Sequence, residues 1–234
     1  MTLQQEDECQ LKQVTIYTDG GCDPNPGSGG YGALVLCGTR SEEISGGFTP
    51  TTNNRMELFA AIAGLETLAA PSQVTLYSDS RYLVDAMTQG WAKRWQANGW
   101  WRTKKERAVN ADLWERLLAL CERHHVAFEW VRGHAGHEQN ERCDVLAMNA
   151  LKQPDLPADP GYEPRSAEQD AIEMTHEGQP CRTCSTPVVK KVPRGKLKPG
   201  QTSYFAYYLE CPNCRAMYRV AEAKRFVETA PTLF

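Results

Sequence analysis

Residues 14–37 read VTIYTDGGCDPNPGSGGYGALVLC, and the spacing of apolar residues in this stretch indicates how the fold begins. Residues 14–18 alternate and are β-branched, which is typical of a strand. Residues 31–37 and the stretch near 42–48 have the pattern of hairpin partners. The sequence therefore predicts three strands at the start of the domain.

Helical and extended patterns alternate after this hairpin. Leu58, Phe59, Ile62, Leu65 and Leu68 recur at helical spacing, and the Thr and Asn residues before them are good N-caps. The later expected elements are a buried strand at 74–78, a helix from about Arg81, an amphipathic helix at 110–124, a last strand at 125–131 and a helix at 138–151. This order predicts an α/β fold, a mixed sheet with crossover helices.

The chain has 234 residues and is 41% hydrophobic, enough for one packed domain and a smaller attachment. We expect an N-terminal extension at 1–12, the α/β domain at 13–152, an acidic Pro-rich linker at 153–177 and a small module at 178–234. No run of 18 apolar residues occurs, and the first residues lack a basic start and an apolar stretch. These features predict a cytoplasmic protein without a membrane segment, and we expect a monomer.

The formal net charge of −3 conceals an uneven distribution. Residues 91–107 carry six Lys or Arg against one Glu, and residues 155–177 carry seven acids against one Arg. Residues 181–226 carry ten basic residues against two acidic ones. The two basic regions are candidates for contact with nucleic acid.

Four carboxylates occupy positions where α/β sheets form sites. Asp19 directly follows the first predicted strand, Asp79 follows the fourth, Glu57 lies in the first turn of the helix between them, and Asp144 lies on the last helix. Each acid alone is more simply explained as a turn or cap residue. Carboxylates brought together would resist ionisation unless cations lay between them, and magnesium prefers such oxygen ligands. The set therefore predicts a site for two divalent ions that act on a phosphodiester.

Four motifs, TDGGCDPNPG at 18–27, TTNNRMEL at 51–58, YSDS at 77–80 and GHAGHEQNERCD at 133–144, together closely resemble the type 1 ribonuclease H family. The resemblance runs from about Val14 to Leu151. It implies a five-stranded mixed sheet flanked by helices, and magnesium- or manganese-dependent hydrolysis of the RNA strand of RNA/DNA hybrids to 5′-phosphate and 3′-hydroxyl ends.

The resemblance also implies residue roles. Asp19, Glu57, Asp79 and Asp144 match the family's metal-binding carboxylates. His134 matches a mobile histidine that assists proton transfer or product release, and glycines near it suit a movable loop. An ordinary surface histidine is the simpler alternative for His134 and the better reading of His137.

Further positions match the family's contacts with substrate. Cys22, Asn25 and Asn53 match positions near the hybrid, and Thr52 with Asn53 matches positions that hold the DNA backbone. These residues also have structural alternatives, because Asn25 can form a turn and Thr52 or Asn53 can cap the helix. Arg81 stands where many relatives have a glutamine, so that contact is expected to differ.

Residues 91–109, WAKRWQANGWWRTKKERAV, resemble the family's basic protrusion. Its cations would pair with DNA phosphates without sequence preference, and its tryptophans would supply rigidity and a stacking surface. Packing tryptophans and a solvated charged face are the alternative. The residues concerned are Trp91, Lys93, Arg94, Trp95, Trp100, Arg102, Lys104 and Lys105.

Two Cys-x-x-Cys pairs mark the C-terminal module, and the remaining five cysteines are scattered as reduced thiols are. Cys181, Cys184, Cys211 and Cys214 predict a tetrahedral zinc site in a zinc ribbon, where the metal would supply folding free energy. Two redox pairs are the alternative, but no thioredoxin-like βαβ pattern surrounds them. The module's role stays open between a second nucleic-acid contact, a protein-docking surface and a purely structural part.

Two other functions compete with hybrid hydrolysis. A protein that only binds hybrids would lack one of the four carboxylates, and none is missing. A nuclease of the same fold acting on DNA is disfavoured by the tryptophan-rich basic tract and by the Asn residues near the metal site. The leading prediction is a hybrid-specific endoribonuclease.

Overall fold

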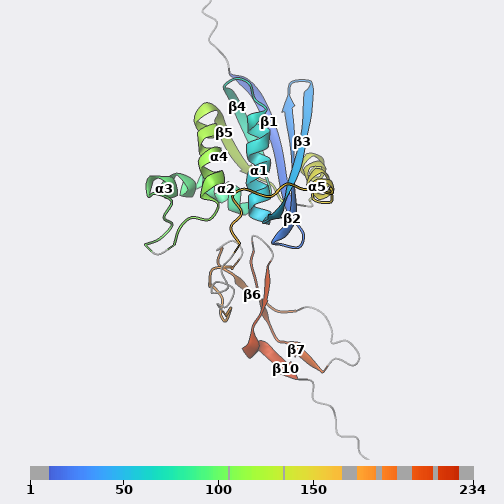
Figure 1. Cartoon of the computed structure of the whole chain (residues 1–234), viewed down its shortest axis with the longest axis vertical. Helices are drawn as coiled ribbons and strands as arrows, with labels where there is room; N and C mark the ends of the chain where they lie inside the picture. Colours follow the sequence, from blue (N-terminus) through green and yellow to red (C-terminus); the bar gives the residue numbers. More distant parts are fainter. Residues whose placement is uncertain are drawn as a thin grey trace, which may run out of the picture. The chain divides into compact units, whose positions relative to one another are not determined.

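The computed structural model describes residues 11–104, 106–133, 135–164, 173–182, 186–193, 202–212 and 216–226 (Figure 1). The chain divides into two compact units, Met1–Tyr162 and Glu163–Phe234. No helix within the described ranges is long and apolar enough to cross a membrane.

The first unit contains a five-stranded mixed sheet with the order β3-β2-β1-β4-β5 (Figure 1). Strands β1, β2 and β3 pair antiparallel, whereas β4 pairs parallel with both β1 and β5. The strands are β1 (Lys12–Cys22), β2 (Gly27–Cys37), β3 (Arg40–Thr51), β4 (Ser72–Ser78) and β5 (His125–Trp130). The mixed sheet and all five predicted strands are confirmed.

Five helices accompany this sheet. They are α1 (Asn53–Glu66), α2 (Arg81–Thr88), α3 (Trp91–Ala97), α4 (Ala111–Arg123) and α5 (Glu138–Ala150). Four of them were predicted from apolar spacing. The fifth, α3, is a short helix inside the basic tract, where the sequence showed no strict amphipathic pattern.

Helices α1 and α5 cover opposite faces of the sheet. A Cβ added to Gly64 of α1 would lie 3.4 Å from the Cβ of Ala33, whereas one added to Gly32 would lie 2.4 Å from the carbonyl oxygen of Cys143 in α5. Because neighbouring residues of a strand point to opposite faces, Gly32 and Ala33 of β2 face different helices. The main core lies between the sheet and the helices α1, α2 and α4, and its largest fully buried side chains include Trp114, Ile16, Met56, Leu58, Ile62 and Leu76.

The first unit extends beyond residue 152, where the sequence placed the start of a linker. The backbone N–H of Thr49 donates to the carbonyl of Pro157 at 2.9 Å. The hydroxyl of Thr51 donates to the Asp159 carboxylate at 2.6 Å, and Asp159 is buried. Residues up to Tyr162 therefore belong to the packed α/β unit.

The second unit contains two small sheets. Strands β6 (Val189–Lys191), β8 (Tyr208–Glu210) and β9 (Met217–Arg219) form an antiparallel sheet, and β7 (Ser203–Phe205) pairs with β10 (Lys224–Phe226). A 3-10 turn, η1 (Ala221–Ala223), precedes β10. Among the described residues of this unit, the buried core consists of Met174, Cys181, Val188, Leu209, Cys211, Val220 and Ala223. Small units of this kind commonly rely on an additional source of stability.

Candidate active site

Two of the predicted carboxylates lie where the pairing between the parallel strands β1 and β4 ends. Thr18 and Ser78 are the last register partners of these parallel strands, so Asp19 and Asp79 are the next residue on each. Asp19 lies inside β1, where it pairs with Gly32 of β2, and not directly after a strand as predicted. The strand continues because the glycines of β2 keep pairing with it after β4 has ended.

Glu57 is held by donors on both carboxylate oxygens. The Asn53 amide donates to its Oε1 at 2.9 Å, and the hydroxyl of Ser80 donates to its Oε2. Glu57 lies in the second turn of α1 and not in the first, because the helix begins at Asn53. A Cβ on Gly20 would lie 2.3 Å from the backbone nitrogen of Glu57, so only glycine allows β1 to touch α1 beside Asp19.

Ser80 was missed by the sequence analysis. It is the N-cap of α2, and its Oγ accepts the Leu83 N–H at 3.2 Å while its hydroxyl donates to Glu57. The capping pattern in YSDS was a signal for this position. The same hydroxyl thus starts α2 and orients a carboxylate of α1.

Asp144 reaches the site because α5 packs directly on glycines of β2. A Cβ on Gly30 would lie 2.2 Å from the carbonyl oxygen of Ala147, and the thiol of Cys143 donates to the carbonyl of Tyr17 at 3.3 Å. These contacts hold the turn of α5 that carries the half-buried Asp144 against β1.

Three of the carboxylates share one electrostatic environment. The pKa of Asp19 is raised to about 8, first by burial and then by the negative charges of Asp79 and Asp144, while the Gly20 N–H opposes the shift. That N–H donates to Asp19 Oδ1 at 2.7 Å. A carboxylate in such surroundings ionises readily only when a cation is near.

The donor set fits hard divalent cations. Among the residues that the structure describes, no three Asp, Glu, His or Cys side chains lie close enough to form a complete protein cage for a metal. Magnesium does not need one, because it is bound through one or two carboxylates and substrate phosphates and keeps several waters. Carboxylate oxygens are nevertheless the kind of ligand that hard divalent cations prefer.

The loop after β5 touches Asp79. A Cβ on Gly133 would lie 2.3 Å from Asp79 Oδ2, and the indole N–H of Trp130 donates to the backbone carbonyl of Asp79 at 3.0 Å. His134 lies outside the described residues, but its neighbour in sequence is thus in contact with a predicted metal ligand.

Arg81 lies flat on an aromatic ring beside the site. Its guanidinium carbon is 3.6 Å from the centre of the Trp130 ring, and its Nη1 is 3.7 Å from Asp85 Oδ1. About half of the side chain, 53%, is exposed. Trp130, which also contacts Asp79, therefore places this cation next to the carboxylates.

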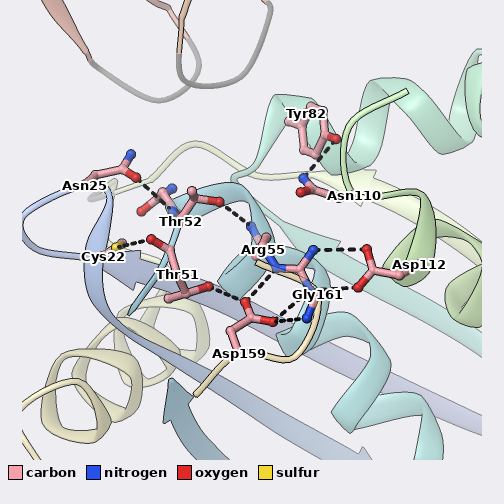
Figure 2. A network of polar contacts seen from close by, with 11 residues as sticks. Cys22, Asn25, Thr51, Thr52, Arg55, Tyr82, Asn110, Asp112, Asp159 and Gly161 are labelled. Carbon is pink, nitrogen blue, oxygen red and sulfur yellow. Dashed lines mark hydrogen bonds and ion pairs between the residues drawn. The ribbon is translucent and has the colours of Figure 1, made fainter. Parts of the chain in front are cut away.

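Asn25 and Thr52 lie near each other at the start of α1 (Figure 2), where Asn53 is the first residue of the helix. Asn25 Oδ1 accepts the backbone N–H of Asn53 at 3.3 Å, and Thr52 Oγ1 caps the helix by accepting the Arg55 N–H at 3.4 Å. The Cys22 thiol contacts the Thr51 carbonyl at 3.5 Å, and burial raises its pKa to about 11. The predicted capping role is therefore present for Thr52, while the Asn53 side chain contacts Glu57.

A buried ionic network supports this turn and was also missed. Figure 2 shows Arg55 between two carboxylates, with bonds of 2.7 and 3.0 Å to Asp112 and of 2.6 and 2.8 Å to Asp159. Arg55 is next but one to Glu57 in α1. A charged residue within the motif NNRMEL, on a helix with a buried face, was the available signal.

Three tryptophans of the basic tract, Trp91, Trp95 and Trp100, pack inward, whereas Trp101 is exposed. Trp91 and Trp95 have ring centres 6.5 Å apart, and Trp95 meets the fully buried Trp114 edge-on at 5.9 Å. Trp100 is also packed against the core. The cations Lys93, Arg94 and Lys104 are exposed, and Lys105 lies outside the described residues.

In the second unit, Cys181 and Cys211 occupy equivalent turns. The Cys181 N–H donates to the carbonyl of Thr186, the Cys211 N–H donates to that of Ala216, and both bonds are 2.9 Å long. Both side chains are buried. The other predicted zinc ligands, Cys184 and Cys214, lie outside the described residues.

Comparisons with known proteins agree with this geometry. Residues 11–152 match the RNase H family model. A protein named Ribonuclease H from Rippkaea orientalis is 60% identical over 157 residues, which cover 67% of this chain and 96% of the relative. Another protein of that name, from Syntrophus aciditrophicus, is 62% identical over 151 residues, covering 64% of this chain and 87% of the relative.

A solved structure supports the same assignment. LC9-RNase H1, described as a type 1 RNase H with the type 2 active-site motif, is similar with a TM-score of 0.54 and 32% identity. The similarity covers 60% of this chain and 72% of that protein. Because the family model spans most of the chain and the four carboxylates lie in the matched region, this chain belongs to the ribonuclease H family.

Proposed function

We propose that the first unit hydrolyses the RNA strand of RNA/DNA hybrids with two magnesium ions, leaving 5′-phosphate and 3′-hydroxyl ends. The observation that carries the proposal is the burial of Asp19 beside Asp79 and Asp144, which raises its pKa to about 8 in the absence of cations. Family membership and relatives named Ribonuclease H at about 60% identity agree with it.

The carboxylates Asp19, Glu57, Asp79 and Asp144 would hold the ions. When bound, the ions activate a water molecule and stabilise the departing oxygen of the phosphodiester. Asn53 and Ser80 fix both oxygens of Glu57, so this ligand needs little reorganisation when the substrate arrives. We assign His134 to proton transfer or product release, which suits a histidine next to the loop contact between Gly133 and Asp79.

The turn beside Glu57 would read the hybrid. Asn25 and Asn53 offer amide groups to the 2′-hydroxyl of the RNA, which alone marks that strand, and Thr52 lies next to them with Cys22 close by. Arg81 carries only donors, so it would contact phosphate or sugar oxygens from its position on Trp130.

The basic tract would hold the DNA strand through Lys93, Arg94, Lys104 and Lys105. Trp91, Trp95 and Trp100 support these cations by packing α3 against the core, which favours a structural share in binding over direct stacking. Contacts of this kind are salt-dependent and independent of base sequence.

A cleavage assay with either strand labelled tests the proposal. With magnesium, the wild type should cut the RNA strand only, and Asp19→Asn should abolish cutting. Asp155→Asn is the matched control, because Asp155 is exposed on the same unit. Cleavage of the DNA strand, or unchanged cutting by Asp19→Asn, would refute the assignment.

We further propose that the second unit is a zinc ribbon, with Cys181, Cys184, Cys211 and Cys214 as ligands. Two observations favour zinc over a redox role. The backbone N–H groups of Cys181 and Cys211 make equivalent hydrogen bonds, as in paired metal-binding knuckles. A bound zinc ion would also stabilise a unit whose described core is small. The Tyr218 hydroxyl lies 3.1 Å from the Cys181 sulfur and would donate to a thiolate there.

Metal analysis of the purified chain tests this second proposal. One zinc per chain is expected, and Cys211→Ser should lose it, whereas Cys37→Ser in the first unit should keep it. A metal-free wild type with reversible thiol oxidation would instead support the redox alternative. We also propose that the protein acts in the cytoplasm, where thiols stay reduced, and that it is a monomer.

A further inference from the structure

Cations and aromatic rings alternate along one surface of the second unit. Lys191 of β6, Tyr208 of β8 and Arg219 of β9 are register partners across the antiparallel sheet. Their side chains therefore lie in one row on the same face. The next residue of β8, Leu209, is fully buried and points to the core, so the row lies on the outer face.

The alternation continues onto the β7–β10 pair. The Arg219 guanidinium lies 5.7 Å from the centre of the Phe205 ring, and Phe205 is the register partner of Lys224. The Lys224 ammonium lies 5.3 Å from the centre of the Phe226 ring. The path, from one end to the other, is Lys191, Tyr208, Arg219, Phe205, Lys224 and Phe226.

This path is open to a ligand. Phe226 is 74% exposed and the three cations are exposed. Tyr208 is half-buried, and Phe205 is half-buried because it also packs against the core of this unit. Glu210 borders the path and accepts the Tyr208 hydroxyl at 3.5 Å. The stretch 181–226 nevertheless has ten basic residues against two acidic ones, so its field favours a polyanion.

We propose that this surface, the cation–ring path, binds single-stranded nucleic acid. The exposed ring of Phe226 and the half-buried ring of Tyr208 offer stacking platforms to unpaired bases, and the cations between them can pair with the phosphates that link those bases. In a duplex the bases are already stacked on each other, so rings would meet mainly the sugar-phosphate backbone. The proposal goes beyond hydrolysis, because it concerns a separate unit and none of the catalytic carboxylates.

Fluorescence anisotropy with the full-length protein tests the path. The probes are labelled oligouridylate and oligothymidylate of roughly 15 nucleotides, without magnesium. Phe226→Ala should weaken binding about fivefold or more, since one base loses its stacking partner. Lys224→Ala should make the plot of log affinity against log salt less steep by about 0.7, which is the contribution of one phosphate contact. Equal losses for both probes would assign the surface to single strands of either sugar, and a loss for one probe would assign it to that sugar.

The opposite face of the same strand pair supplies matched controls. Tyr204 and Arg225 are register partners that point away from Phe205 and Lys224. Tyr204→Ala and Arg225→Ala should bind both probes as the wild type does. All four variants should cleave a short hybrid at the wild-type rate under saturating substrate, which separates this proposal from the hydrolytic one.

Three results would overturn the proposal. The first is wild-type affinity and salt slope in both Phe226→Ala and Lys224→Ala, as expected of a surface that docks a protein. The second is a loss of affinity in the control variants as large as in the path variants. The third is a larger loss of affinity for a blunt hybrid duplex than for single strands in the path variants, which would assign the surface to duplexes.

Discussion

Arg55 and Asp159 form a buried, bidentate ion pair between residues 104 positions apart. Arg55 Nε lies 2.6 Å from Asp159 Oδ2 and Arg55 Nη2 lies 2.8 Å from Oδ1. The side chains are 2% and 0% exposed. The pair joins the first turn of α1, which precedes Glu57, to the end of the first unit, and Asp112 of α4 holds the other edge of the same guanidinium.

Removing one partner of this pair should destabilise the first unit. Asp159→Asn leaves a buried guanidinium only partly compensated, so the free energy of unfolding should fall by about 3 kcal/mol. Urea unfolding followed by tryptophan fluorescence measures this, because all six tryptophans lie in the first unit. Asp155→Asn should change little, since Asp155 is exposed at a φ of 60°, which Asn tolerates. Equal stability of the two variants would contradict the role assigned to the pair.

The position of a C-terminal truncation should matter for the same reason. A chain ending at residue 164 keeps Asp159 and the bond from Thr49 to Pro157, whereas one ending at residue 152 loses both. We expect the longer fragment to unfold at the same urea concentration as the first unit of the full chain, and the shorter fragment to unfold well below that concentration. Indistinguishable midpoints would show that residues 153–162 do not contribute to the fold of this unit.

Ser80→Ala should impair both α2 and Glu57. Loss of the N-cap should cost about 1 kcal/mol of stability. Loss of the donor to Glu57 should lower kcat for hybrid cleavage about tenfold, as loss of a supporting contact to a metal ligand commonly does. Ser80→Thr should recover most of the rate. Thr88→Ala is the control, because its hydroxyl bonds only to the helix carbonyl of Val84. A wild-type kcat in Ser80→Ala would remove Ser80 from the site.

The raised pKa of Asp19 predicts how the metal-free protein depends on pH. Because the folded-state pKa of about 8 exceeds the ordinary value of 3.8, the folded state holds a proton that the unfolded state releases. Stability should therefore fall as pH rises from about 4 to 8, and Asp19→Asn should be the more stable protein at pH 8 by about 1 kcal/mol or more. Unfolding in magnesium-free buffer, followed by tryptophan fluorescence and without a chelator that would strip zinc, measures this. Added magnesium should stabilise the wild type and leave Asp19→Asn nearly unchanged; a wild type indifferent to pH and to magnesium would contradict the shared site.

Periodicity predicted most of the first unit because its elements are long and patterned. The five strands and the helices α1, α2, α4 and α5 each show a spacing of apolar residues that one face of the fold requires. Helix α3 has only seven residues, which is less than two helical periods and too short to show a clear apolar pattern. Its tryptophans point to the core, but its cations do not form a separate stripe.

The segment 153–162 was predicted as a linker for a physical reason. Its Pro- and Asp-rich composition has no periodicity. Its only charged attachment among the described contacts is Asp159, whose partner Arg55 lies far away in sequence, beside a backbone bond from Thr49 to Pro157. Composition cannot tell a solvated carboxylate from one that neutralises a buried arginine. The candidate carboxylates were easier to identify, because each lies in a recognisable motif. Their exact positions within β1 and α1, as for Asp19 and Glu57, depend on how far the strand and the helix extend.

Gly20, Gly30 and Gly32 show that the catalytic geometry also depends on atoms that are absent. At each of them a single methyl group would come within 2.4 Å of main-chain atoms of α1 or α5. An alanine there would push a helix, and with it Glu57 or Asp144, away from the sheet, although the sequence would still contain every acid. Inactivating alleles of this enzyme should therefore include changes that no survey of polar or charged positions would flag.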